Sequence, residues 1–302
     1  MGDVWIGFTV AAALFQAWRT ALQQALRGTL SADGAAFVRF LYGAPVAALL
    51  LAGWSAVTGR APAPLQGTFL AFAAAGGVAQ LLATSALMRA FAARGYAVGT
   101  AYAKTEAVQG ALLAWLLLGE TVSAVAAGGV ALSLFGVLVL SSPGGAGSLS
   151  SLLRQAGQPA ALWGLAAGGG FAVAAVLFKA ATLSLGGVDR ILDALATLAV
   201  ATVLQSGLMG AWLARAEPAQ LRLAIAAWRR AVPVGLLSAF GSACWFSAFA
   251  LGPVALVRAL GQVEMLFTLA FGRLYLRERI TGAGTVGFAL VVAGVVLVVV
   301  GR

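Results

Sequence analysis

Ten apolar stretches, each long enough to cross a lipid bilayer, follow one another along the chain with short polar segments between them. A helix of about 20 apolar residues spans the hydrocarbon core, where the backbone must satisfy its own hydrogen bonds. We predict ten transmembrane helices, at residues 4–25, 35–57, 67–91, 96–118, 122–140, 160–183, 190–213, 231–251, 254–276 and 282–300. Charged residues make up only 9% of the chain, against about 25% in soluble domains, so a soluble fold is excluded.

The chain repeats itself at an offset of 158 residues. Alanines and leucines would match by composition alone, but glutamates, tryptophans and glycines in one register indicate a duplication. The matched pairs are Glu106 and Glu264, Glu120 and Glu278, Trp5 and Trp163, Trp54 and Trp212, Gly77 and Gly235, Gly129 and Gly287, and Gly136 and Gly294. Because each half has five spans, an odd number, the second half must enter the membrane from the opposite side.

This duplication predicts an all-α integral membrane fold of two inverted five-helix repeats around a central cavity. The first repeat covers residues 1–141 and the second covers residues 159–302. Between them, residues 142–158 are rich in glycine and serine, a composition typical of an exposed, flexible linker.

Whole classes of chemistry are excluded by residues that the sequence lacks. There is no histidine, and the one cysteine, Cys244, lies in an apolar stretch. These facts exclude imidazole-based triads, disulfide frameworks and His/Cys metal sites, and no Walker-type phosphate loop is present. We expect no enzymatic activity and no cofactor. The net charge of +10 comes mostly from arginines between the spans, without interleaved aromatics, so we expect no nucleic-acid partner.

Two glutamates lie near the middle of predicted spans. Glu106 and Glu264 are each about ten residues into a helix, which brings both to the same depth near the bilayer centre. Lys104 is two residues from Glu106, about 200° around the helix, so it must pair elsewhere, and Glu264 is the natural partner if the two helices are neighbours. The glutamates either form a structural ion-pair latch or bind substrate and exchange protons. For the Arg258 side chain two outcomes are equally open: it stays among these charged side chains, or it extends to the membrane interface by snorkelling.

Further polar and aromatic side chains in the spans complete the candidate site. Interior cations suit a substrate carboxylate or phosphate, amides can hydrogen-bond a ligand, and aromatic rings can line an apolar wall. The candidate substrate-binding or coupling residues are Glu106, Glu264, Lys104, Arg19, Lys179, Gln80, Gln262, Tyr102 and Trp245. We predict no catalytic residue and no metal ligand.

Structural roles account for several other features. Glu120 and Glu278 each precede a span, so we expect them to cap the first turn of the helices at 122–140 and 282–300. The run Gly168–Gly170 either packs closely or bends its helix. Arg190 and Asp193, three residues apart, are expected to form an exposed or interfacial pair.

Basic residues set the predicted orientation. Twelve arginines near span ends fall on one side of the membrane and three on the other, and the basic side faces the cytoplasm. We therefore expect a multi-pass protein of the cell inner membrane with both termini outside. The acidic N-terminal segment lacks a signal peptide's basic region, so the first span is expected to be retained.

Each half ends with an apolar helix, a glutamate (LLLGET, LYLRERI) and a glycine-spaced last helix. In this and in its five-plus-five duplication, the chain resembles the EamA family of the drug/metabolite transporter superfamily. The resemblance implies ten helices around a central cavity and alternating access by rocking of the halves. It also implies export or exchange of small metabolites, amino acids among them. Arg277 stands where the tidiest pattern has a glycine before Glu278, so the second signature is weaker.

We therefore expect a secondary transporter, an exporter of a small polar or amphipathic metabolite such as an amino acid. Transport would be driven by protons or by the substrate gradient. The expected partners are this small molecule, membrane lipid and, for the first driving force, protons. We expect a monomer, with a dimer as the alternative. The alternative function is a non-transporting membrane scaffold or lipid-binding accessory protein.

Overall fold

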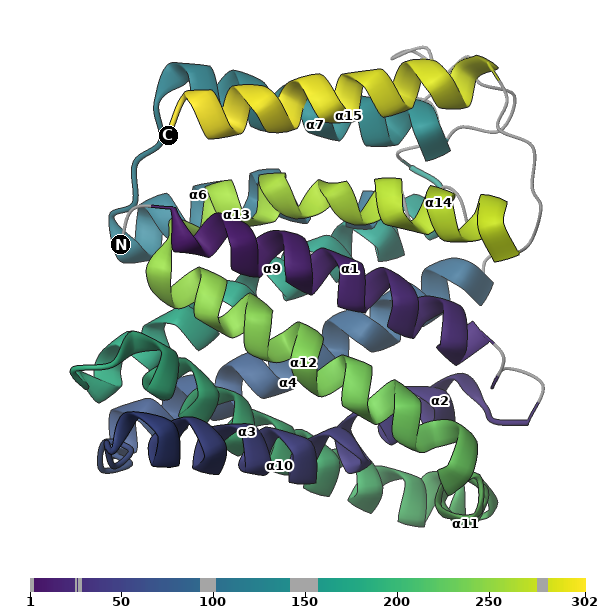
Figure 1. Ribbon diagram of the computed structural model, residues 1–302. Coiled ribbons are helices and arrows are strands. Elements are labelled where there is room, and N and C mark those ends of the chain that lie inside the picture. Colours follow the sequence, from purple (N-terminus) through teal and green to yellow (C-terminus); the bar gives the residue numbers. More distant parts are fainter. Residues whose placement is uncertain (1–2, 25, 27–28, 93–101, 142–156, 276–281) are drawn as a thin grey trace. The chain divides into compact units, whose positions relative to one another are not determined.

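The computed structural model describes residues 3–24, 26, 29–92, 102–141, 157–275 and 282–302, and this part of the chain is helical without strands (Figure 1). The helices are α1 (Val4–Gln24), α2 (Ala32–Leu41), α3 (Gly43–Thr58), α4 (Gly67–Ala92), α6 (Glu106–Leu118), α7 (Ala124–Ser141), α9 (Pro159–Leu185), α10 (Arg190–Ala216), α11 (Pro218–Ala226), α12 (Trp228–Leu251), α13 (Val254–Leu260), α14 (Glu264–Tyr275) and α15 (Gly282–Val300), with a 3₁₀ turn η1 (Gly261–Val263). The predicted linker falls largely outside the described residues, as does Glu278.

Long apolar helices identify the chain as a multi-pass membrane protein. Five helical segments among the described residues are long and apolar enough to cross a bilayer: Ala32–Thr58, Gly67–Ala90, Pro159–Leu185, Arg190–Ala216 and Trp228–Leu251. Shorter apolar helices cover Glu106–Leu118, Ala124–Val139 and Val286–Val300. Large apolar side chains on these helices are exposed, Leu49 at 71% and Leu117 at 64%, as expected of surfaces that face lipid.

Two compact units make up the structure, and each draws on both halves of the sequence. The first unit consists of Met1–Val78 and Leu177–Leu251. The second unit consists of Ala79–Val176 and Gly252–Arg302. The helices α4 and α9 contribute residues to both units.

In the first unit, α1 lies along α12, and α10 packs against α2, α3 and α12. The span predicted as one helix at 35–57 is instead divided at Tyr42, where α2 ends and α3 begins. Gly235 of α12 sits against this division: a Cβ there would meet the side chain and backbone of Tyr42 and lie 3.0 Å from the nitrogen of Gly43. Glycine thus allows the two backbones to approach closely.

The second unit contains a tightly packed pair of helices, α7 and α15 (Figure 1). A Cβ on Gly129 would lie 2.7 Å from the carbonyl oxygen of Gly294, and one on Gly136 would lie 2.9 Å from that of Gly287. Between these contacts, the Ser133 hydroxyl donates to the carbonyl oxygen of Val291 over 3.4 Å. Small residues therefore bring the two backbones together, as is usual in membrane helix pairs.

The N-terminus of α2 is bonded to the region that follows α10. Ser31 caps α2 by accepting the N–H of Gly34 at 3.1 Å. The Ser31 hydroxyl also donates to Glu217 at 2.7 Å, and its N–H donates to the Gln220 side chain at 2.8 Å. A helix cap and a long-range tie are thus made by one residue.

The N-terminus of α10 is bonded in turn to the end of α3. Asp189 caps α10 by accepting the N–H groups of Ile191 at 3.0 Å and Leu192 at 3.2 Å. Its other oxygen accepts the Trp54 indole N–H at 3.0 Å and lies 3.5 Å from the Arg60 guanidinium. Burial alone would raise the pKa of Asp189, but the bonds from Trp54 and the two backbone N–H groups, together with Arg60, hold this pKa below its ordinary value.

The lowered pKa of Asp189 predicts a pH-dependent part of the stability. A carboxyl with a pKa lower in the folded than in the unfolded state stabilises the fold above its unfolded pKa, about 3.9, and the stabilisation is lost as the pH falls through the folded value. Melting temperatures of wild type and Asp189→Asn should differ by a constant amount above about pH 5 and converge on acidification below about pH 4. A difference that persists unchanged into stronger acid would contradict this role.

Next to this cap, Arg190 and Asp193 form the predicted pair, with Nη1 and Oδ2 3.8 Å apart. Of the two predicted settings, exposed or interfacial, the exposed one is wrong for the acid: the Asp193 side chain is 2% exposed, whereas that of Arg190 is 42% exposed. Gly187 explains the burial, because the Asp193 carboxylate occupies the space that a Cβ on Gly187 would need. The carboxylate is thereby shielded from the surface.

Candidate functional site

Both predicted spans that carry a central glutamate are interrupted just before it. The segment predicted as one helix at 96–118 has a turn at Lys104 and Thr105, and α6 begins at Glu106. In the span predicted at 254–276, α13 gives way to the 3₁₀ turn η1, and α14 begins at Glu264. Each glutamate is therefore the first residue of a helix, where the positive end of the helix dipole favours a carboxylate.

Local polar contacts account for the first interruption. The Thr105 hydroxyl donates to the carbonyl oxygen of Tyr102 at 2.5 Å and accepts the Gln109 side-chain N–H at 2.8 Å. Such side-chain bonds offer the backbone an alternative to the helical ladder. They hold the turn that presents Lys104.

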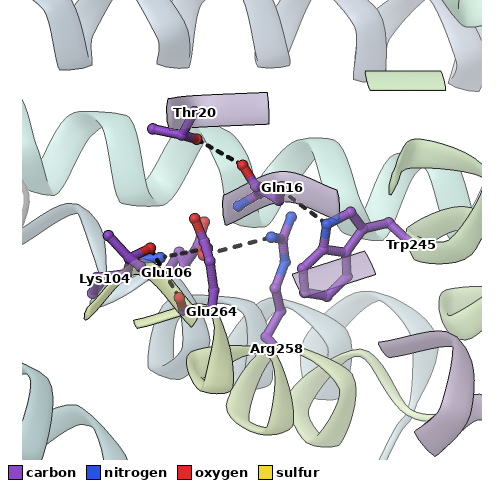
Figure 2. A network of polar contacts seen from close by, with 8 residues as sticks. Gln16, Thr20, Lys104, Glu106, Trp245, Arg258 and Glu264 are labelled. Atoms are coloured by element: carbon purple, nitrogen blue, oxygen red, sulfur yellow. Dashed lines mark hydrogen bonds and ion pairs between the residues drawn. The ribbon is translucent and has the colours of Figure 1, made fainter. Parts of the chain in front are cut away.

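Two ion pairs connect the two interrupted spans within the second unit (Figure 2). Lys104 Nζ lies 3.0 Å from Glu264 Oε2, which confirms the pairing predicted for this lysine. Arg258 Nη1 lies 3.5 Å from Glu106 Oε1, so this arginine pairs within the unit instead of extending to the interface. The four side chains are between 13% and 15% exposed. Each glutamate thus meets a cation from the other span.

Arg258 makes a further contact with α9. Its Nη2 donates to the carbonyl oxygen of Phe171 over 3.4 Å. Charge compensation and a backbone acceptor together lower the cost of holding a guanidinium among apolar helices. Arg258 therefore joins three segments: α13, the start of α6 and the middle of α9.

Neighbouring segments pack closely against α9 at the Gly168–Gly170 run. The helix continues through these glycines, and of the two roles predicted for them, close packing is the one that the contacts support. A Cβ on Gly168 would lie 2.8 Å from the carbonyl oxygen of Ala103, and a Cβ on Gly169 would lie 2.8 Å from the Gln109 side chain. A Cβ on Gly170 would lie 2.8 Å from the Cβ of Ala83. The glycines thus make room for the turn that carries Lys104.

Glu120 ties the same two spans together at another point. Its carboxylate accepts the N–H of Val254, the first residue of α13, at 2.8 Å. We expected Glu120 to cap the following helix, but at α7 it is Ser123 whose hydroxyl accepts the N–H of Ala126 at 3.1 Å. Glu120 caps a helix that comes more than 130 residues later in the chain.

The remaining predicted site residues are divided between the units. In the second unit, Gln262 in η1 is 2% exposed, Tyr102 is 9% exposed, and Gln80 lies on α4. In the first unit, Lys179 on α9 is 8% exposed and Arg19 lies half-buried on α1. Also in the first unit, the buried Trp245 donates its indole N–H to the Gln16 side chain at 3.0 Å (Figure 2).

Sequence reasoning missed the roles of Arg258, Thr105 and Gln109. The spacing within each span carries a signal for Arg258, since this cation precedes Glu264 by six residues, much as Lys104 precedes Glu106 by two. Both distances leave the cation and the glutamate of one span unable to pair locally and available to the other span. The roles of Thr105 and Gln109 depend on the turn at residues 104 and 105, which the pattern of apolar residues does not reveal.

Residues 158–300 match the EamA-like transporter family. The match covers the second half of the chain, so the likeness to the EamA-like transporter family is shown for that half. The family is part of the drug/metabolite transporter superfamily, whose members are membrane transporters, not enzymes.

Twenty-one chains of solved structures match this protein. One of them, a crystal structure whose description says only that it is of a protein, matches with a TM-score of 0.76 at 17% identity and covers 100% of this chain and 99% of its own. At this identity the likeness extends to the fold alone. No curated protein matches this chain significantly.

Proposed function

We propose that this protein is a secondary transporter of the EamA type that exports a small polar or amphipathic metabolite, such as an amino acid. The observation that carries the proposal is the pair of reciprocal ion pairs, Lys104 with Glu264 and Arg258 with Glu106, at two interrupted spans. Interrupted helices near the membrane centre are where transporters bind substrates and coupling ions. Ionisable groups kept at this depth cost free energy, which favours a functional role.

The charges of the four side chains suit a ligand without net charge. Two cations and two carboxylates sum to zero, so a zwitterion could place its carboxylate on Lys104 or Arg258 and its ammonium group on a glutamate. A ligand with one net charge would leave an unpaired charge at low dielectric, which is costly. Either protons or the substrate gradient would drive the exchange.

We also propose that residues 1–141 and 159–302 are inverted repeats, joined by the linker at 142–158. Contacts between α7 and α15 support this assignment. Ser133 bonds the residue 158 positions later, its own counterpart at the repeat offset. Gly129 and Gly136 each contact the counterpart of the other, as a two-fold axis between the helices requires.

The two capped helices of the first unit obey the same relation. Ser31 and Asp189 are 158 residues apart, and each caps the start of an apolar segment, Ala32–Thr58 and Arg190–Ala216 respectively. Each is also bonded to the far end of the other's segment or to the residues just after it. Inverted repeats are the arrangement on which alternating access is built. We therefore propose alternating access at the Glu106 and Glu264 site, in an inner membrane with both termini outside.

Transport by purified protein in liposomes tests this proposal. The panel should include amino acids, nucleosides and cationic drugs, each with and without a pH gradient. We expect flux of at least one zwitterionic solute and a loss of about tenfold or more in Glu106→Gln and Glu264→Gln. Glu217→Gln, which alters a glutamate bonded to Ser31, is the matched control and should retain flux.

The outcomes separate a transport site from a latch. Glutamine variants that unfold at lower temperature but transport at the wild-type rate would assign the ion pairs a purely structural role. A protein that moves no solute of the panel in either direction would contradict the transporter itself.

A further inference from the structure

A basic, apolar surface lies at one end of the first unit, around the short helix α11. Four arginines cluster in the sequence just before, within and after this helix, and all four are exposed. They are Arg215, Arg222, Arg229 and Arg230. Large apolar side chains of the same segment are exposed too: Leu223 at 42%, Ile225 at 53% and Trp228 at 53%. We call these seven residues the α11 surface.

The α11 surface stands on a fixed platform. Ala224 of α11 is fully buried, and the Tyr42 hydroxyl lies 3.2 Å from the carbonyl oxygen of Ala224 and 3.1 Å from that of Ile225. The N-terminal end is held through Glu217 and Gln220, both bonded to Ser31. The side of α11 that faces Tyr42 and Ser31 is thus held by hydrogen bonds, and among the described residues no carboxylate lies in an ion pair with Arg222 on this helix.

The arginines of this surface are not compensated by acids. Within the part of the chain that the structure describes, none of the four lies in an ion pair with a carboxylate. Glu217, the one acid among residues 215–230, already accepts from Ser31. Arg229 lies 5.4 Å from the centroid of the Trp228 ring, so an aromatic ring and a cation share one place on the surface.

We propose that the α11 surface binds the headgroups of anionic phospholipids. Guanidinium groups bind phosphate oxygens through two parallel hydrogen bonds, and clustered basic residues beside a membrane span attract anionic lipid. Tryptophan prefers the level of the headgroups, and the apolar Leu223 and Ile225 can enter the acyl boundary. A free phosphate or a nucleic acid would leave these three apolar side chains in water. A lipid is therefore the partner that fits both the arginines and the apolar side chains of the surface.

Lipid retention tests this proposal, which does not depend on the transported solute. The purified full-length protein is reconstituted in vesicles of equimolar phosphatidylglycerol and phosphatidylcholine with identical acyl chains, extracted gently, and the retained lipids are counted by native mass spectrometry. We expect wild type to retain phosphatidylglycerol preferentially. The triple variant Arg222→Gln, Arg229→Gln, Arg230→Gln should lose about tenfold or more of this preference.

The chain offers a matched control at the other end of α10, the helix that carries Arg215. Arg60 and Arg190 lie near the start of α10, about 40 Å along the helix from Arg215. The double variant Arg60→Gln, Arg190→Gln should retain the wild-type preference. Melting temperatures in phosphatidylcholine alone should be equal for the triple variant and wild type, since the altered side chains are exposed.

Three results would overturn the assignment. The triple variant could keep the full preference for phosphatidylglycerol, or the control variant could lose as much of it. Excess inorganic phosphate could also displace the bound lipid completely, which would show that the surface recognises free phosphate. The variant Trp228→Ala keeps all four arginines, and a partial loss of the phosphatidylglycerol preference in it would support the amphipathic character of the site.

Discussion

Lys104→Met should lower the free energy of unfolding by about 3 kcal/mol, because it removes the cation of the Glu264 ion pair from a site that is largely closed to water. The same change should abolish any substrate exchange that needs the pair. Removal of both charges in Lys104→Met, Glu264→Leu should restore most of the stability, since an apolar pair avoids the cost of desolvating two ions. Thermal and denaturant unfolding in one detergent measures the free energy of unfolding of the wild type, the single variant and the double variant.

The double-mutant cycle decides whether the pair is coupled. We expect the double variant to be more stable than the sum of the two single changes predicts, by at least about 1 kcal/mol. The corresponding cycle at Arg258 and Glu106 should give a smaller coupling, because this contact is longer, 3.5 Å against 3.0 Å. Additive effects at Lys104 and Glu264 would mean that the observed contact contributes little free energy.

Gly129→Ala should destabilise the protein by about 2–3 kcal/mol, although it adds a single methyl group. The new Cβ would lie 2.7 Å from the carbonyl oxygen of Gly294 and 2.7 Å from the nitrogen of Val298, both backbone atoms that cannot rotate away. Relief requires α7 and α15 to separate along their whole contact. Thermal unfolding of the purified variant measures the effect.

The adjacent residue provides a matched control. A Cβ on Gly128 would have no atom within 4 Å, so Gly128→Ala should be neutral or slightly stabilising through helix propensity. The two variants have identical composition and differ only in the face of α7 that they alter. Equal effects of the two changes would show that the close approach of the helices does not govern stability.

The spans were predictable because lipid enforces a simple rule on the sequence. A backbone in hydrocarbon must form helices, so apolar length alone located α1, α10 and α12 to within a few residues. The contact between Lys104 and Glu264 was also predictable, since helix geometry excluded a local partner and the repeat offset suggested Glu264.

What sequence reasoning did not predict depends on short-range polar competition and on backbone approach. The turns before Glu106 and Glu264 interrupt a span for only two or three residues, too few to alter the apolar pattern. The burial of Asp193 depends on the space that Gly187 leaves, and the division at Tyr42 coincides with the approach of Gly235. Each of these needs a partner whose position only the folded chain supplies.

The packing of α1 on α12 has a consequence for biosynthesis. Helix α1 leaves the ribosome well before α12, its main partner in the same unit, which lies roughly 230 residues later in the chain. At about 5–20 residues per second, α1 must wait on the order of 10–45 s in the membrane before α12 is made. The face of α1 that packs on α12 therefore needs a temporary neighbour, such as the insertion machinery or another early helix. A chain truncated before Leu251 would keep α1 permanently without this packing, so neither half of the sequence is expected to persist alone.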